Sequence, residues 1–353
     1  MMSQRRRVRA SGQPDGVGPG MGSPSSVTDC AYNRWVGCGS GVRIVDERVI
    51  EHEPVLCTEV LAIVAPQPGQ TVVDVTVGHG GHSRLFAPAI GEQGRLIGLD
   101  VDPGNLERAR TRILTGAPAC PQVDLVRVNF RELDAVLDEL GVGQVDVIFA
   151  DLGVSTDQLL DPARGLTFAE DGPLDMRLDD RVNRTAADLV NGMSEGELSD
   201  LIWENSQEHF SRRIAKRICE SRRNGRIRTT QQLVRIVCSA VGSSPESRRE
   251  RIHPATRAFL ALRMAVNAEL GNLQSLLASA PKRLAPGGRL GVISFHSGED
   301  RIVKQDFLDR KRAALYEIET KKPVRPSEGE MQRNPRSRSA KMRVARRTEQ
   351  PGP

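Results

Sequence analysis

The chain has 353 residues, of which 38% are hydrophobic and 27% are charged, and its formal net charge is +5. This composition is typical of a globular enzyme or binding protein, and an aromatic content of only 3% predicts a mainly aliphatic core. No run of about 18 apolar residues occurs, so we expect no membrane span and a cytoplasmic protein. The six cysteines form no CxxC pair, which argues against a zinc ribbon or a disulfide framework.

The first 48 residues differ from the rest of the chain. They include RRRVR at residues 5–9 and continue in a stretch rich in Gly, Pro and Ser. Such a segment buries too little apolar surface to offset the entropy that it would lose on ordering. We therefore expect a disordered basic extension over residues 1–48, without the apolar core of a secretion signal.

From Thr71 onward, short β-branched runs alternate with segments in which apolar residues recur every three or four positions. Strands that alternate with helices indicate right-handed βαβ units and a parallel sheet. The pattern predicts strands at 71–76, 95–100, 123–128 and 145–151, and helices at 103–114 and 130–140.

The alternation stops after Asp151 for about a hundred residues. This part of the chain is polar, and its periodicity predicts helices at 194–205 and 229–241 without a strong strand. A helical region at 255–284, broken near Gly271 or Pro281, and a strand at 284–295 then resume the earlier pattern.

The simplest architecture is one doubly wound α/β domain with a helical insertion after its fourth strand. We expect the two parts of the α/β domain at residues 49–158 and 255–353, the second ending in a basic tail. The helical insertion would cover residues 159–254.

The stretch DVTVGHGGHS, residues 74–83, follows the first predicted strand at the edge where open α/β sheets bind ligands. Its glycines allow the backbone to turn sharply and to approach a ligand closely. Asp100 ends the second predicted strand, where a carboxylate can accept hydrogen bonds from both hydroxyls of a ribose. The sequence therefore predicts a nucleoside-containing cofactor. His79 and His82 offer only two metal ligands, so we expect no metal at this turn.

A nicotinamide dinucleotide and S-adenosylmethionine would both place a ribose against such an acid. The dinucleotide fingerprint GxGxxG, counted from Gly78, has Ser83 where glycine or alanine is expected. Asp74, inside the first strand, suits the ammonium group of S-adenosylmethionine and repels a diphosphate. These features favour the methyl donor and leave the dinucleotide open.

Positive charge is concentrated in two further segments. Between His209 and Arg228 there are eight Lys or Arg and one Glu, and between Arg310 and Arg347 there are 13 Lys or Arg and four Glu. Such clusters fit the phosphate backbone of a nucleic acid, although charge does not distinguish RNA from DNA.

Several longer strings resemble the motifs of one family: HEPVLCTEVL (52–61), DLGVSTDQL (151–159), GPLDMRLD (172–179), HPATRAFLALRMAVN (253–267) and LAPGGRLGVISFHSGEDRIVK (284–304). Together with VGHGGHS they resemble the MraW/RsmH family of S-adenosylmethionine-dependent methyltransferases. Members of that family modify N4 of a cytosine in the decoding region of 16S rRNA. The resemblance implies a Rossmann-like class I methyltransferase sheet, with small-subunit rRNA, within the ribosomal subunit, as the partner. It leaves a homodimer open.

The resemblance also assigns roles to individual residues. The inserted helices would recognise the substrate, and Asp151 and Gln158 would border the target base as well as the donor. The residues that would contact the cofactor are Gly80, Gly81 and His82 at the turn, Asp100 at the ribose, Phe130 near the adenine, and Asp151 and Gln158.

Asp151 is the candidate catalytic residue. The amino group of cytosine is a poor nucleophile because its lone pair is delocalised into the ring, so a group that accepts a hydrogen bond from its N–H would favour attack. Many amino methyltransferases have a Pro-Pro pair after the corresponding acid or amide, and this chain contains none. The residues alone leave open whether Asp151 assists catalysis, binds the cofactor or caps a helix.

Two competing functions remain at this point. A nicotinamide-dependent dehydrogenase would also explain the glycine turn and Asp100. A non-catalytic RNA-binding module would explain the basic clusters and the missing Pro-Pro pair.

Overall fold

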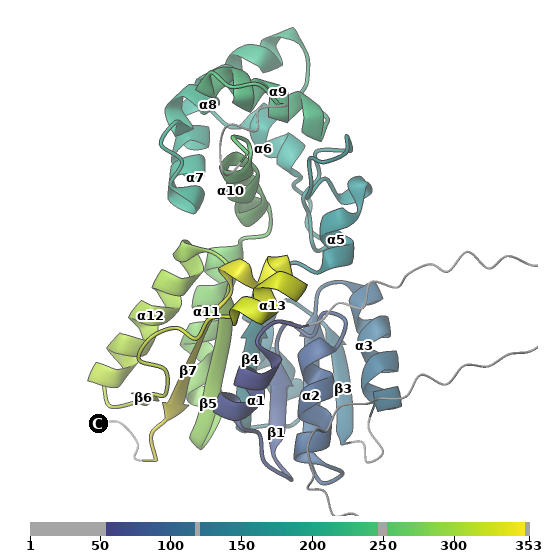
Figure 1. Cartoon of the computed structure of the whole chain (residues 1–353), viewed down its shortest axis with the longest axis vertical. Coiled ribbons are helices and arrows are strands. Elements are labelled where there is room, and N and C mark those ends of the chain that lie inside the picture. The colour runs from purple at the N-terminus through teal and green to yellow at the C-terminus, as the bar shows by residue number, and fades with distance from the viewer. Residues whose placement is uncertain (1–53, 117–120, 246–252, 350–353) are drawn as a thin grey trace, which may run out of the picture. The chain divides into compact units, whose positions relative to one another are not determined.

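The protein contains a seven-stranded sheet with the strand order β3-β2-β1-β4-β5-β7-β6 (Figure 1). The computed structural model describes residues 54–116, 121–245 and 253–349, so the predicted extension at residues 1–48 lies outside the described residues. The strands are β1 (Thr71–Asp74), β2 (Arg95–Asp100), β3 (Gln122–Arg127), β4 (Val145–Asp151), β5 (Leu284–Ser294), β6 (Tyr316–Ile318) and β7 (Lys341–Arg347).

The first five strands pair in parallel, as the alternation of strands and helices predicted. The sequence of strands along the chain runs outward from β1 through β2 to β3, and then returns to the other side of β1 with β4 and β5. The strand order therefore reverses between β1 and β4, which is the place where doubly wound sheets bind ligands. The predicted doubly wound α/β sheet is confirmed.

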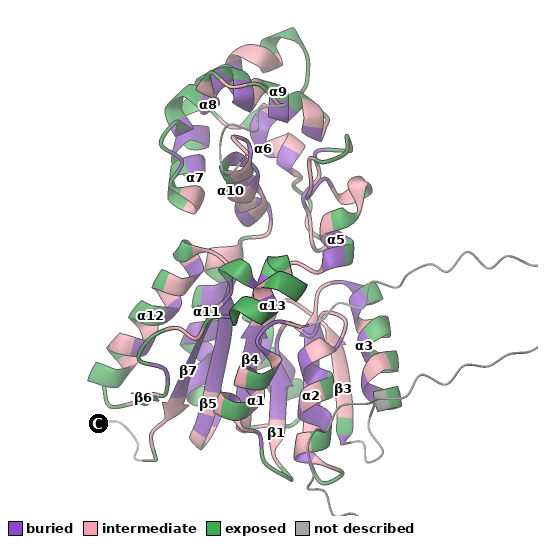
Figure 2. Cartoon of the chain, in the orientation of Figure 1, coloured by how far each residue is buried: buried purple, intermediate pink, exposed green. Residues whose placement is uncertain are grey.

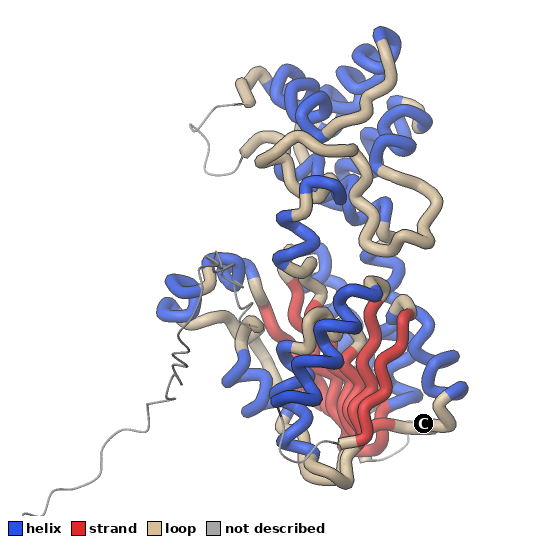
Figure 3. Tube along the Cα trace, turned by 90° about the vertical axis from the view of Figure 1, so that its right-hand side faces the viewer, coloured by secondary structure: helices blue, strands red, loops and turns tan. Residues whose placement is uncertain are grey.

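Helices cover both faces of this sheet (Figure 3). Successive strand residues point to opposite faces, so Val72 packs in one apolar cluster and Val73 in the other. The central strands are buried on both faces, which explains their nearly continuous apolar sequence (Figure 2). The face of Val72 is covered by α1 (Cys57–Val64), α2 (Gly81–Ile90) and α3 (Pro103–Gly116), and the face of Val73 by α4 (Leu133–Glu139), α11 (Glu269–Arg283) and α12 (Ser297–Arg312).

A third apolar cluster is built by helices between β4 and α11. The predicted helices at 194–205 and 229–241 are confirmed as α7 and α9, and both begin with a capping box, at Ser194 and Thr229. The cluster continues past the predicted boundary at residue 254 because Phe259 belongs to it. The helices are α5 (Thr156–Leu160), α6 (Ala186–Gly192), α7 (Glu195–Ser206), α8 (Ser211–Ser221), α9 (Thr230–Val241) and α10 (Thr256–Val266).

The long helical region breaks at a different place from the one predicted. Gly271 and Pro281 both lie inside α11, and the break falls at Asn267 and Ala268, where Ala268 has φ 50°. The side chain of Asn267 accepts a hydrogen bond from the Leu178 N–H at 2.8 Å and donates one to the Met176 carbonyl at 2.8 Å. These long-range contacts fix the break, and no local helix-breaking residue announces them.

The last part of the predicted basic tail is a strand inside the sheet. β7 lies antiparallel between β5 and β6. Arg343 is nearly buried and pairs with Asp300 at 2.7 Å, and Arg346 pairs with Glu317 and Glu319. Part of the positive charge that suggested nucleic acid is therefore used within the fold. None of the described helices is long and apolar enough to cross a membrane.

Replacement of Asn267 tests the contact between the helix break and the loop at Met176. We expect Asn267→Ala to lower the free energy of unfolding by about 2 kcal/mol, because it leaves the Leu178 N–H and the Met176 carbonyl without their partner. Urea denaturation measures this change. Asn224→Ala, at an exposed position, is the control and should have little effect; equal effects of the two variants would contradict the assignment.

Candidate functional site

A cavity of about 650 Å³ opens at the carboxyl ends of β1, β2 and β4, where the strand order reverses. It brings together segments that are far apart in the sequence, from Pro54 to Ser339. Six of the seven predicted site residues line it: Gly81, His82, Asp100, Phe130, Asp151 and Gln158.

Gly80, the seventh, does not line the cavity and packs against α3 instead. It adopts φ 78° at the start of α2, and a Cβ at this position would lie 3.0 Å from the Cα of Ala109 in α3. Only glycine satisfies both constraints. Its contact with a cofactor remains a prediction.

Asp100 is tied directly to the glycine turn. The backbone N–H of Gly78 donates to its Oδ2 at 3.0 Å, and the N–H of Asp102 donates to its Oδ1 at 2.8 Å. Asn105 approaches both oxygens, at 3.3 and 3.2 Å. Burial nevertheless raises the pKa of Asp100 to about 6, against the effect of these hydrogen bonds. A carboxylate offers about four acceptor positions, so Asp100 retains capacity for a ligand hydroxyl.

Asp74 does not have the position that the sequence suggested. It is almost fully buried, accepts a hydrogen bond from Ser83 Oγ at 2.7 Å, and does not line the cavity. Burial raises its pKa to about 6. The carboxyl group therefore stabilises the glycine turn through its hydrogen bond with Ser83. This corrects the expectation that Asp74 contacts an ammonium group in the cavity. Ser83 is explained as the partner of Asp74.

His82 and Asp151 are neighbours in the lining of the cavity. The Nε2 of His82 lies 2.9 Å from the Val55 carbonyl, and because a carbonyl only accepts, we place the ring proton on Nε2. Nδ1 is then the unprotonated nitrogen and lies 3.7 Å from Asp151 Oδ2. Burial lowers the pKa of His82, which keeps the ring neutral near pH 7.

Asp151 is the predicted site residue whose carboxyl group is buried with an oxygen, Oδ1, that lacks a hydrogen-bond partner among the described residues. Burial raises its pKa to about 7, and the nearby carboxylate of Glu299 adds to the effect. A carboxyl group that gains and loses a proton near neutral pH is suited to accept a proton from a substrate.

His79 is a second polar group of the turn. Arg108 donates to its Nε2 at 3.4 Å, and Asp157 Oδ2 lies 3.6 Å from the same atom. Neither turn histidine belongs to the possible metal group that the described residues contain, which is formed by Glu269, His296 and Glu299.

Most polar atoms of that group have contacts within the fold, whereas His296 Nε2 is buried and has no hydrogen-bond partner among the described residues. Glu269 accepts two hydrogen bonds from Arg263, at 2.8 and 2.9 Å. Glu299 accepts from the Phe295 N–H at 2.9 Å, and the His296 ring accepts from the Glu299 N–H at 3.4 Å. We therefore assign these side chains to an ion pair and a helix cap.

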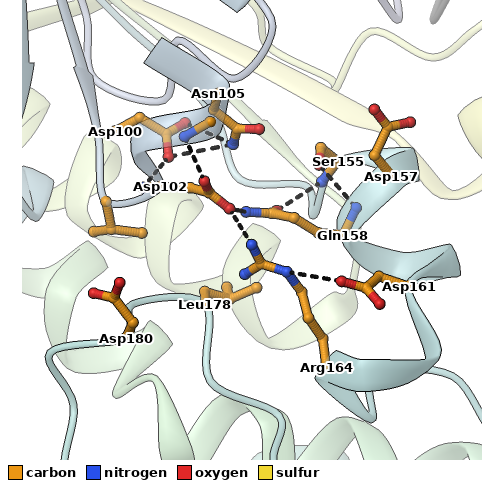
Figure 4. Close-up of polar contacts among 12 residues, drawn as sticks. Asp100, Asp102, Asn105, Ser155, Asp157, Gln158, Asp161, Arg164, Leu178 and Asp180 are labelled. Atoms are coloured by element: carbon orange, nitrogen blue, oxygen red, sulfur yellow. Dashed lines mark hydrogen bonds and ion pairs between the residues drawn. The ribbon is translucent and has the colours of Figure 1, made fainter. Parts of the chain in front are cut away.

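Gln158 connects the cavity to the helical segments (Figure 4). Its Nε2 donates to Asp102 Oδ2 at 2.9 Å, and Arg164 donates to the same oxygen at 2.6 Å. Asp102 lies two residues after Asp100, the last residue of β2, whereas Arg164 lies in the 3₁₀ turn η2 (Pro162–Arg164). Two hydrogen bonds to one nearly buried carboxylate therefore link the predicted ribose site to the start of the insertion.

The GPLDMRLD motif continues from this link to the cavity. The Met176 N–H donates to the Arg164 carbonyl at 2.8 Å. Arg177 forms two hydrogen bonds with the carboxylate of Asp175, both at 2.8 Å, and this pair holds the loop in shape. Leu178 and Asp179, at the end of the motif, line the cavity.

Some cavity residues were not identified from the sequence. Arg263, Asn267 and Glu269 lie at the junction of α10 and α11. Arg336 and Arg338 belong to the 3₁₀ segment η4 (Pro335–Ser339). Arg263, Asn267 and Glu269 lie inside or next to a string that resembled the family, but no single pattern distinguishes these residues or the two arginines from surface residues.

The raised pKa of Asp151 predicts a measurable cost in stability. Its folded-state pKa, about 7, exceeds the unfolded value near 3.8, so the carboxyl group increasingly destabilises the fold as the pH rises from about 4 to 7. Asn mimics the protonated carboxyl group. We expect Asp151→Asn to increase the free energy of unfolding by about 1 kcal/mol or more at pH 8 and by almost nothing at pH 4.

Urea denaturation at both pH values measures the difference. Asp157→Asn, at an exposed carboxylate, is the control and should show a smaller dependence on pH. An Asp151→Asn variant that is no more stable at pH 8 than the wild type would contradict the raised pKa.

Comparison with known proteins gives the site a family. The MraW methylase family model matches residues 49–348. The ribosomal RNA small subunit methyltransferase H of Koribacter versatilis is 47% identical over 310 residues, covering 85% of this chain and 96% of that protein. The proteins of the same name from Synechococcus and Heliobacterium mobile are 47% and 44% identical over 309 and 312 residues, covering 86% and 84% of this chain and 94% and 98% of theirs. The chain therefore belongs to the MraW methylase family of methyltransferases.

Proposed function

We propose that this protein transfers a methyl group from S-adenosylmethionine to N4 of a cytosine in the decoding region of 16S rRNA, within the small ribosomal subunit in the cytoplasm. Family membership and the names of the relatives support an rRNA methyltransferase. The observation that carries the proposal is the position of Asp151, a buried carboxyl group with a free oxygen in the same cavity as Asp100.

The residues present fit S-adenosylmethionine. The cavity volume of about 650 Å³ lies within the range of ~300–1,000 Å³ that is usual for ligand sites. Asp100 would accept hydrogen bonds from the ribose hydroxyls, Phe130 would lie against the adenine, and the turn at Gly81 and His82 would hold the methionine part. When bound, S-adenosylmethionine supplies an activated methyl group and leaves as a neutral thioether.

Asp151 would act on the acceptor. The N4 amine of cytosine needs a partner that orients its lone pair and takes up the proton lost when the N–C bond forms. Asp151 lines the cavity and one of its oxygens has no hydrogen-bond partner in the part of the chain that the structure describes, so the carboxyl group would accept a hydrogen bond from N4–H, and a pKa of about 7 allows the carboxylate to take that proton at neutral pH. No Pro-Pro pair is needed for this role.

His82 would act through Asp151 as a positioning residue. Its proton on Nε2 is held by the Val55 carbonyl, so Nδ1 offers a lone pair toward Asp151 Oδ2. At 3.7 Å this contact is no hydrogen bond, so His82 would orient the carboxyl group of Asp151 without exchanging a proton with it.

The two alternative functions are less well supported. The family findings support a methyltransferase and not a nicotinamide-dependent dehydrogenase. A non-catalytic RNA-binding module does not explain a buried carboxyl group with a raised pKa inside a large cavity.

Labelled S-adenosylmethionine and unmethylated small ribosomal subunits test the reaction. We expect label on N4 of one cytosine of the 16S rRNA, located by mapping the modified nucleotide. Asp100→Ala should weaken binding of S-adenosylmethionine at least tenfold in calorimetry, because the ribose loses a charged acceptor. Asp200→Ala, on the exposed side of α7, is the control. Label on adenine, or on no rRNA, would overturn the proposal.

The pH dependence of the transfer step tests the role of Asp151. We expect the single-turnover rate to rise with pH through about 7, because only the ionised carboxylate accepts the proton. Asp151→Asn should lower this rate by a factor of about 10² to 10⁴ while binding of S-adenosylmethionine is largely retained. A variant with the wild-type rate would exclude Asp151 as the proton acceptor.

A further inference from the structure

Two exposed arginines stand at the mouth of the cavity. Arg336 and Arg338 both line it, and neither forms a hydrogen bond or an ion pair with any described residue. Arg263, another cation of the cavity, differs because its guanidinium is bound to Glu269. The segment η4 therefore places two uncompensated positive charges at the entrance.

The arginines are held in place by the residue between them. Ser337 is fully buried, its hydroxyl donates to the Asn334 carbonyl at 2.8 Å, and its own carbonyl accepts from the Ala340 N–H at 2.8 Å. Because neighbouring residues of this short turn point in different directions, the anchor at Ser337 leaves Arg336 and Arg338 exposed on either side of it.

The same segment is connected to the residues beside Asp151. Glu330 of α13 (Glu328–Arg333) is nearly buried and accepts a hydrogen bond from the Leu56 N–H at 2.8 Å. The preceding residue, Val55, holds the ring of His82 through its carbonyl. Two hydrogen bonds therefore connect the helix that precedes the arginines to His82, whose Nδ1 lies 3.7 Å from Asp151 Oδ2.

The charge of the cavity changes sign from its interior to its mouth. The interior carries carboxylates such as Asp100, Asp151 and Glu299, which repel a phosphate but accept hydrogen bonds from a base amine. An enzyme that acts on a base must take that base out of the stack, and the phosphates on either side of it then remain outside the pocket. Guanidinium groups match the geometry of phosphate oxygens.

We propose that Arg336 and Arg338 bind the RNA phosphates next to the target cytosine while its base occupies the cavity. This inference rests on the proposed function, since it takes RNA as the substrate. The arginines bind and orient the nucleotide and take no part in the proton transfer. A base enters deeply enough to reach Asp151 only when its backbone is held at the rim.

The test compares two double variants that remove the same charge. Arg336→Gln/Arg338→Gln removes the arginines at the mouth. Lys321→Gln/Lys322→Gln removes two exposed cations of the same part of the chain that do not line the cavity. Methyl transfer to unmethylated small ribosomal subunits is measured over a range of salt concentrations, and binding of S-adenosylmethionine by calorimetry.

For the arginine variant we expect KM for the subunits to rise at least tenfold and the affinity for S-adenosylmethionine to stay unchanged. The slope of log KM against log salt concentration should fall by about 1.4, since each phosphate contact to a single strand contributes about 0.7. The lysine variant should behave as the wild type. Arg336→Lys/Arg338→Lys should restore the salt dependence and only part of the affinity.

Two results would overturn the inference. One is an equal KM for the arginine and lysine variants. The other is a loss of thermal stability or of S-adenosylmethionine affinity that accounts for the change, which would make the arginines structural. Failure of the proposed function is distinct, because the wild-type protein would then transfer no methyl group to cytosine.

Discussion

Three neighbouring parallel strands end in aspartates at one desolvated edge of the sheet, and the site depends on how each carboxyl group is satisfied. Asp74 ends β1, Asp100 ends β2 and Asp151 ends β4. Burial raises the pKa of all three. Like charges and low polarity at this edge oppose ionisation, so each ionised carboxylate needs donors from the surrounding chain.

The three carboxyl groups differ in the hydrogen-bond donors that surround them. Asp74 is closed off by Ser83 and supports the turn, and Asp100 is held by backbone N–H groups but keeps acceptor capacity toward the cavity. Asp151 keeps one oxygen without a partner. The difference in hydrogen bonding, rather than in residue type, separates a structural acid, a proposed binding acid and a proposed catalytic acid.

The helical segments are attached to this edge at a few defined points. Asp102 binds both Gln158 and Arg164, and Asn267 binds the loop at Met176 and Leu178. The C-terminal segment makes a third attachment, through Glu330 and Leu56. These contacts join the helices that would recognise the substrate to the residues that would bind the methyl donor. A small movement of the helices would therefore change the positions of the donor-binding residues.

Periodicity and glycine placement in the sequence determined the parallel core and the position of the cavity. The βαβ pattern predicted β1 to β4, because the spacing of apolar residues indicates which face of an element is buried. The glycine turn at residues 78–81 marked the carboxyl end of β1. Family resemblance then selected site residues, of which only Gly80 does not line the cavity. The roles of these residues remain predictions until the experiments are done.

Tertiary structure alone decided the helix break at Asn267, the burial of Asp74 and the placement of β7. Asn267 breaks the helix through contacts to residues about ninety positions earlier, and Asp74 is buried at the end of the central strand β1, where Ser83 donates a hydrogen bond to it. The charged segment at β7 becomes a strand because β5 and β6 pair with its backbone and Asp300 neutralises Arg343. Local sequence carries no signal for such contacts, since their partners are supplied by distant parts of the chain.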